Sequence, residues 1–115
     1  MNIVRIIANY VDGTTIVNST RLIIMAGIDD RGKLIDGEWH GHIVVDGAKY
    51  PFILHENGVI DYGDGYDLPD RHSPSDLKHK KLIKVNEYIS VIEQEDSRSV
   101  KCLYKITTVI GYNLL

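Results

Sequence analysis

The chain has 115 residues, of which 43% are hydrophobic and 25% are charged, as in ordinary globular proteins and unlike disordered chains or coiled coils. This length fits a single domain over residues 1–115 and is enough for one hydrophobic core without disulfide staples. The net charge of −3 argues against a dedicated nucleic-acid-binding protein, whose domain is usually strongly basic.

Cysteine usage and hydropathy indicate where the protein works. The one cysteine, Cys102, has no partner for an intramolecular disulfide, which favours a reducing compartment. The first residues lack the pattern of a signal peptide, and the longest apolar run, residues 22–28, is far shorter than the roughly 18 residues of a membrane span. We therefore expect a cytoplasmic protein with no membrane association.

The N-terminal residues predict a β-hairpin followed by a buried strand. Residues 4–11 are rich in β-formers and lead into Asp12-Gly13, a pair typical of a type I′ turn, with the return strand over 14–17. The apolar run 21–25 then predicts a buried strand, although a short helix is the alternative because so brief a run has no decisive period.

Residues 38–55 predict a second hairpin around an Asp46-Gly47 turn. A two-residue turn sets one face of the hairpin, on which Val45 faces Ala48, Ile43 faces Tyr50, Gly41 faces Phe52 and Trp39 faces Leu54. All of these pairs can pack, so this face belongs to the core, and Gly41 leaves room for the ring of Phe52.

The second strand of this hairpin, residues 48–55, is also the first strand of a third predicted hairpin. Pro51 has no N–H to donate, so outer strand pairing is absent or stops at this point. Residues 56–58, Glu-Asn-Gly, suit a three-residue loop that keeps the side-chain parity. On this register Ile60 and Tyr62 join the core face, and Asp61 points to the other face.

The C-terminal part contains an ambiguous segment and a clear strand. Residues 73–76, Ser-Pro-Ser-Asp, resemble a capping box and predict a short helix over 74–81. Residues 82–92 fit a strand of a terminal hairpin, with a helix over 74–94 as the alternative. Residues 99–110 alternate, with these side chains on one face: Val100, Cys102, Tyr104, Ile106 and Ile110.

Together these elements predict a mainly β protein with six or seven antiparallel strands, closed into a barrel, roll or small sandwich, and one short helix. The alternative is an α+β fold with the helix at 74–94. Several strands are apolar on both faces: Ile3 and Ile7 oppose Val4 and Ile6, and Leu103 and Val109 oppose Tyr104 and Ile106. Because such strands are usually covered on both faces, we expect a homo-oligomer, most simply a dimer.

The polar face of the second hairpin carries a set of residues with possible chemistry. Strand alternation places Glu38, His40 and His42 on one side, the turn register sets His55 opposite Glu38, and Asp61 follows one strand further over. Imidazoles and a carboxylate are ligands for Zn²⁺ or Fe²⁺, and Asp61 is then a candidate general base. The alternatives are an interface, a solvated face or proton sensing by the histidines.

Two further segments are candidate contact sites. Segment 61–70 carries acidic and tyrosine side chains that suit a Ca²⁺ loop or a recognition loop, or else a flexible surface loop: Asp61, Tyr62, Asp64, Tyr66, Asp67 and Asp70. A basic run follows and suits phosphate or an acidic partner, or else a solvated helix end: Lys78, Lys80, Lys81 and Lys84.

The sequence thus favours a small non-catalytic binding protein that acts as a homo-oligomer and needs no cofactor. It would recognise a protein or a small ligand through segment 61–70 and the His-rich sheet face. No catalytic residue is assigned, since Cys102 lies on an apolar strand face, where a thiol is usually inert. The alternative is a small metal-dependent hydrolase or oxygenase with its metal at Glu38, His40, His42 and His55.

Overall fold

The computed structural model describes residues 1–63, 72–95 and 97–112, with the side chain of residue 95 also left aside. In these ranges the chain forms eight β-strands and no helix, where the sequence predicts six or seven strands. The strands are β1 (Asn2–Asp12), β2 (Thr15–Ile28), β3 (Trp39–Val45), β4 (Ala48–Leu54), β5 (Val59–Asp61), β6 (His72–Pro74), β7 (Tyr88–Glu95) and β8 (Arg98–Tyr112).

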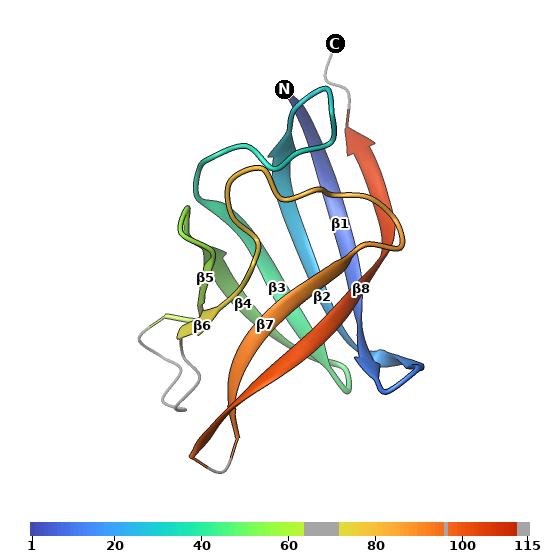
Figure 1. The fold of residues 1–115 in the computed structure, drawn as a ribbon, viewed down its shortest axis with the longest axis vertical. Coiled ribbons are helices and arrows are strands. Elements are labelled where there is room, and N and C mark those ends of the chain that lie inside the picture. Colours follow the sequence, from blue (N-terminus) through green and yellow to red (C-terminus); the bar gives the residue numbers. More distant parts are fainter. Residues whose placement is uncertain (64–71, 96, 113–115) are drawn as a thin grey trace.

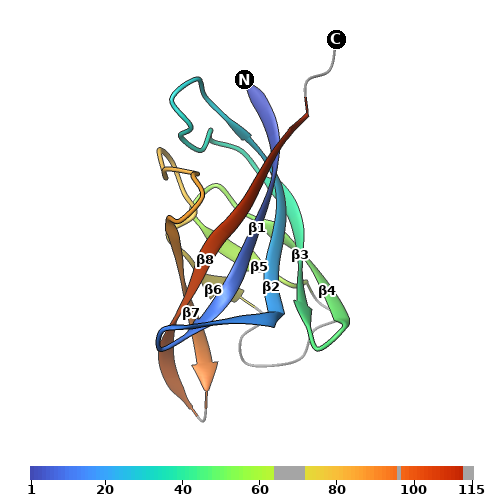
Figure 2. The ribbon, with the colours of Figure 1, turned by 90° about the vertical axis from the view of Figure 1, so that its right-hand side faces the viewer.

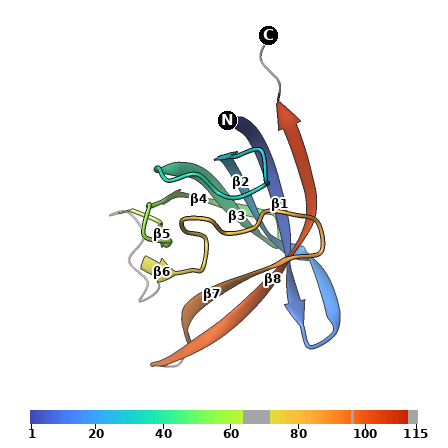
Figure 3. The same ribbon diagram turned by 45° about the horizontal axis from the view of Figure 1, so that its top comes forward.

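All strands belong to one antiparallel sheet in the order β6-β5-β4-β3-β2-β1-β8-β7. The sheet curls so that its two end strands approach each other, as Figures 1 and 3 show. Directly after β6, Ser75 forms a bridge with Val91 of β7, and the N–H of Asp76 donates to the Ser90 carbonyl at 3.1 Å. The mainly β fold and the antiparallel, nearly closed barrel are therefore confirmed.

The first hairpin forms, but its turn lies one residue later than predicted. Asp12 pairs with Thr15, which leaves Gly13 and Thr14 as the turn residues. Gly13 has a φ of 63°, and Thr14 is not among the residues with positive φ. Glycine at the first central position is typical of a type II′ turn, whereas type I′ needs positive φ at both central positions. The assignment of a type I′ turn to Asp12-Gly13 is therefore wrong.

The second strand is longer than the sequence indicates. β2 contains the predicted strand 21–25 and continues without a break from the turn to Ile28. Its register against β1 shifts between two successive pairs, Asn9 with Arg21 and Tyr10 with Val17. This irregularity leaves residues 18–20 of β2 without paired residues in β1.

The second hairpin has the predicted register at each of the four core-face pairs and the predicted two-residue turn, which is of type I′. Asp46 and Gly47 both have positive φ, 49° and 87°. A Cβ atom added at Gly41 would lie 2.4 Å from the Ile23 carbonyl oxygen and 2.9 Å from Cζ of Phe52. The absence of a side chain at this position is what lets the phenyl ring and the neighbouring strand approach.

The third predicted hairpin, formed by β4 and β5, also has the predicted register. The N–H of His55 donates to the carbonyl of Val59 at 2.9 Å around a three-residue loop in which Gly58 has a φ of 92°. β4 pairs with β5 only through its last two residues, so its outer pairing stops short of Pro51 as expected. Ile60 is buried, and Tyr62 packs edge-on against a core phenylalanine with ring centroids 5.7 Å apart.

The predicted helix over 74–81, and its alternative over 74–94, is wrong. The N–H and the hydroxyl of Ser75 both donate to the carbonyl of Gly58, at 2.9 and 2.6 Å. Asp76 bonds to one residue of β7 through its backbone N–H (3.1 Å) and its Oδ1 (3.0 Å). These long-range hydrogen bonds occupy the groups that a helix turn would have used, so the segment links the two ends of the sheet and continues through turns as an irregular loop.

Two loops cover the barrel end at which both termini lie (Figure 1). Loop 29–38 and segment 75–87 are joined by backbone hydrogen bonds, including Leu34 N to Lys81 O and Ile83 N to Gly32 O, both 2.8 Å. Their buried side chains close this end of the core: Leu34, Leu77 and Ile83. The strand predicted over 82–92 accordingly begins only at Tyr88.

The last strand changes its side-chain parity at a bulge. In the pairing with β1, Ile7 lies opposite Thr108 and Ala8 opposite Ile106, so Thr107 is an extra residue. Beyond this bulge Val109 packs against the core, whereas Ile110 is exposed. The assignment of Ile110 to the core face is therefore wrong, while the other four residues of that face are confirmed.

The core fills the inside of the barrel with branched aliphatic and aromatic side chains. The most deeply buried large side chains are those of Ile6, Leu22, Ile24, Leu54, Ile60, Leu77, Ile89, Tyr104 and Ile106. In the described part of the chain, no helix is long and apolar enough to cross a membrane.

Candidate functional site

The outer face of β1–β4 is the candidate site because it combines the His-rich strand with exposed apolar side chains. Strand pairing places these residues in successive positions of one row across the sheet: Asp61, Ile53, His40, Met25 and Arg5. The row continues to His72 beyond Asp61 and to Ile110 beyond Arg5. Ile53 and Met25, on either side of His40, are 38% and 40% exposed. Figure 2 shows β2, β3 and β4 along one side of the molecule, with β7 on the opposite side.

A second row runs beside the first and is also largely apolar. Its residues follow from the same pairings, in the order Pro51, His42, Ile23 and Ile7. Ile23 is buried although it lies on the outer face. We call Ile53, His40, Met25, Pro51, His42 and Ile23 the outer-face patch.

Two shallow pockets open on this patch and share His40. The larger, about 290 Å³, is lined by Arg5, Ile23, Met25, His40, Gly41 and His42. The other, about 240 Å³, forms where β4 and β5 diverge and is lined by His40, Pro51, Phe52, Ile53, Asp61, Tyr62 and Gly63. Mixed apolar walls with a few polar groups are typical of surfaces that bind other molecules.

Positive charge surrounds His42. Burial is the main cause that lowers the pKa of His42, and repulsion by Lys49, Arg5 and Arg21 lowers it further. The imidazole is therefore neutral at pH 7. Within residues 1–63, 72–95 and 97–112, none of these three cations forms an ion pair. This part of the face is positively charged and available to an anionic group.

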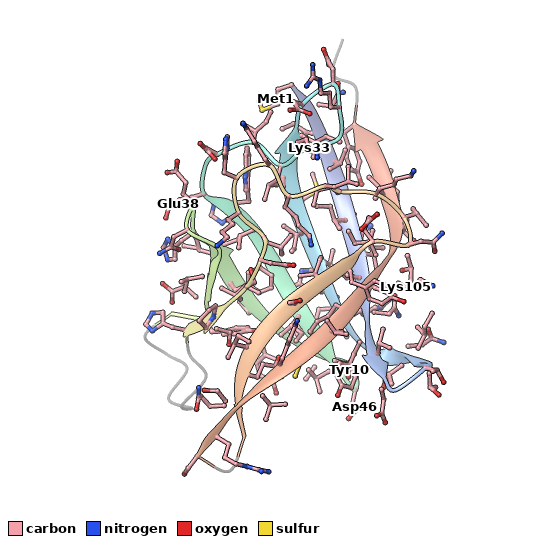
Figure 4. All side chains as sticks on the ribbon, in the orientation of Figure 1. Met1, Tyr10, Lys33, Glu38, Asp46 and Lys105 are labelled. Carbon is pink, nitrogen blue, oxygen red and sulfur yellow. The ribbon has the colours of Figure 1, made fainter. Side chains whose placement is uncertain are left out.

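The acidic side chains lie at the margin of the face near β4 and β5. Nδ1 of His55 lies 2.5 Å from Oε2 of Glu38, and its Nε2 lies 2.9 Å from Oδ2 of Asp61. His72 of β6 approaches the other oxygen of Asp61 at 3.3 Å. Glu38, labelled in Figure 4, lies on the opposite side of the molecule from Lys105 of β8.

These contacts explain the titration of the cluster. The hydrogen bonds with Asp61 and then Glu38 raise the pKa of His55, which favours an imidazolium that donates from both ring nitrogens. The bonds from His55 and from the N–H of Gly63 lower the pKa of Asp61. Two carboxylates against one imidazolium leave this end of the face negative.

The predicted metal site is brought together only in part. Glu38, His55 and Asp61 meet as the register indicated, but both ring nitrogens of His55 already face carboxylates. His40 and His42 lie further along β3, on the outer-face patch. Of the side chains that the structure describes, no three His, Cys, Asp or Glu are grouped so as to hold a metal ion. The geometry therefore gives the zinc or iron site no support.

The predicted recognition loop lies only partly within the described residues. Asp61 belongs to the charged cluster, and Tyr62 turns inward onto Phe52. The other candidate residues lie outside the described part of the chain: Asp64, Tyr66, Asp67 and Asp70.

The basic run 78–84 lies in the covering segment rather than at a helix end. Nζ of Lys81 lies 2.8 Å from Oδ2 of Asp76, so this cation already has a partner. Lys80 has a φ of 65°, a left-handed conformation that marks a turn. Lys78 and Lys84 are exposed. The run remains a candidate for anion contact, with one of its four lysines already paired.

Two polar arrangements, one at the margin of the site and one inside the barrel, do not follow from the sequence patterns above. His72 reaches Asp61 because the short strand β6 pairs with β5, and no sequence pattern marked β6. Inside the barrel, Cys102 and Tyr104 both donate to the Glu93 carboxylate at 3.2 Å, and burial raises the pKa of Tyr104. Alternation along the terminal hairpin could have found this triplet, since β7 places Glu93 on the same face as the core residues.

No protein-family model, curated protein or solved structure shows significant similarity to this chain. Its function must therefore be argued from its own residues.

Proposed function

We propose that this protein is a small non-catalytic interaction protein that acts as a homo-oligomer and binds through the outer-face patch. The observation that carries the proposal is the exposure of Met25 and Ile53 on either side of His40, in a row that continues to an arginine with no ion pair among the described residues. A sheet face that only meets water is usually polar, whereas exposed apolar side chains beside charges are typical of interaction surfaces.

The polar side chains of this face favour binding rather than catalysis. A catalytic site needs a poised acid, base or nucleophile near a pocket. The thiol of Cys102 is buried in the core and does not reach this face. Both ring nitrogens of His55 form hydrogen bonds with carboxylates. The remaining histidines, His40 and His42, border shallow pockets with apolar walls. This arrangement suits contact with another molecule, and the start of segment 61–70 borders one of the two pockets.

The proposal is tested with two variants that each replace an exposed apolar residue of β2 by glutamate, one inside the patch and one outside it. Met25→Glu puts a charge into the outer-face patch, and Ile16→Glu puts the same charge at an equally exposed residue of the same strand, outside the patch (both 40% exposed). Immobilised wild-type protein and Ile16→Glu should retain the same binding partners, the chain itself included. Met25→Glu should lose them. Equal retention by all three proteins would contradict the proposal.

A further inference from the structure

The central row of the outer face has a pattern that is complementary to itself. Read across the sheet, its five central positions are acid, apolar, imidazole, apolar, base: Asp61, Ile53, His40, Met25 and Arg5. Neighbouring strands lie about 4.8 Å apart, so Asp61 and Arg5 are separated by roughly 19 Å. His40 stands in the middle of this row.

From this pattern we propose that the occupant of the outer-face patch is a second copy of this chain, packed about a two-fold axis at His40. This inference rests on the proposed function, because it names the partner of the same surface. In a two-fold contact each residue meets the one at the mirrored place in the row. Asp61 of one copy then faces Arg5 of the other, and Ile53 faces Met25.

The charges on either side of the row favour the same arrangement. Glu38 lies beside Asp61 with a side chain 61% exposed, and it adds negative charge to that end. Arg5 has no ion pair among the described residues, so a carboxylate of the second copy would be its partner. A two-fold contact centred on the cations near His42 instead would bring like charges together, which is unfavourable.

The extent of the patch predicts a weak dimer. A standard stable interface buries about 800 Å² on each partner. Two rows of side chains across four or five strands cover less than this, and only Met25 and Ile53 contribute large exposed apolar groups to the central row. We therefore expect monomer and dimer to exchange, with the dimer forming at tens to hundreds of micromolar protein.

Sedimentation equilibrium of the untagged chain from about 5 to 500 µM tests the inference. The wild type should show a monomer–dimer equilibrium, and Met25→Glu and Arg5→Glu should each weaken it at least tenfold. The controls Ile16→Glu and Arg98→Glu should leave it unchanged. Thermal unfolding of each variant shows that the fold is kept, which is expected since all four side chains lie at the surface.

The outcomes separate the inference from the function on which it rests. A wild-type chain that stays monomeric to the highest concentration overturns the second copy as occupant. A dimer that Ile16→Glu breaks and Met25→Glu leaves intact also overturns it, because the contact then lies elsewhere. If the monomeric wild type still retains another protein that Met25→Glu loses, the interaction function stands with a different partner. If neither dimer nor patch-dependent partner is found, both are contradicted.

Discussion

Replacement of Gly41 by alanine is the sharpest test of how the second hairpin joins the barrel. The added Cβ would lie 2.4 Å from a backbone carbonyl oxygen, that of Ile23, and 2.9 Å from the ring of Phe52. Overpacking of a tight site costs about 1–3 kcal/mol. We expect a cost near about 3 kcal/mol, because the carbonyl belongs to the central pairing of β2 with β3 and cannot move aside as a flexible side chain would.

Thermal and urea unfolding measure this cost. For a domain of this size about 1 kcal/mol corresponds to roughly 4 °C, so Gly41→Ala should lower Tm by about 12 °C. Gly111→Ala is the matched control, since a Cβ at Gly111 of β8 meets nothing within 4 Å and its φ is not positive. It should change stability by less than about 0.5 kcal/mol. A Gly41→Ala protein as stable as this control would refute the packing of Phe52 against the bare backbone.

Three further predictions concern the charged and polar side chains. Because its folded pKa is raised above the ordinary 6.5, His55 contributes stability at pH values below 6.5 that is lost as the pH rises through its folded pKa. The lowered pKa of Asp61 adds stability above its ordinary 3.8 that is lost as the pH falls through its folded pKa. Chemical unfolding across pH should show both limbs, and His55→Gln should remove the upper one. Tyr104→Phe removes a buried hydrogen bond to a carboxylate and should cost about 1–3 kcal/mol in urea unfolding. Native mass spectrometry with added Zn²⁺ should find no specific adduct that the double substitution His40→Ala and His42→Ala removes, and such an adduct would revive the metal-enzyme hypothesis.

The parts of the fold that sequence predicts well are those in which local and pairwise signals agree. The Asp46-Gly47 turn and the four facing pairs of β3 and β4 each imply the same register, and the structure has it. The contact of Glu38 with His55 follows from that register, and the approach of Asp61 follows from the loop that ends in Gly58.

The parts that sequence misses depend on contacts between distant segments. The capping-box pattern at residues 73–76 predicts a helix, but hydrogen bonds from Ser75 to Gly58 hold the chain extended. One extra residue, Thr107, reverses which side chains of β8 face the core, and no residue type in that strand predicts the bulge. The exposed patch as a whole does not follow from the sequence, because the partners of the strand over 21–25 are not predicted, and this strand joins Arg5 to His40 through Met25.

Nuclear magnetic resonance at two concentrations gives the most direct test of the outer-face patch as the interaction surface. Amide and side-chain spectra of the untagged protein at about 20 and 500 µM should differ at Met25, His40 and Ile53 and stay constant at Ile16. Unchanged patch signals at both concentrations, or changes confined to other faces, would contradict self-association through this surface.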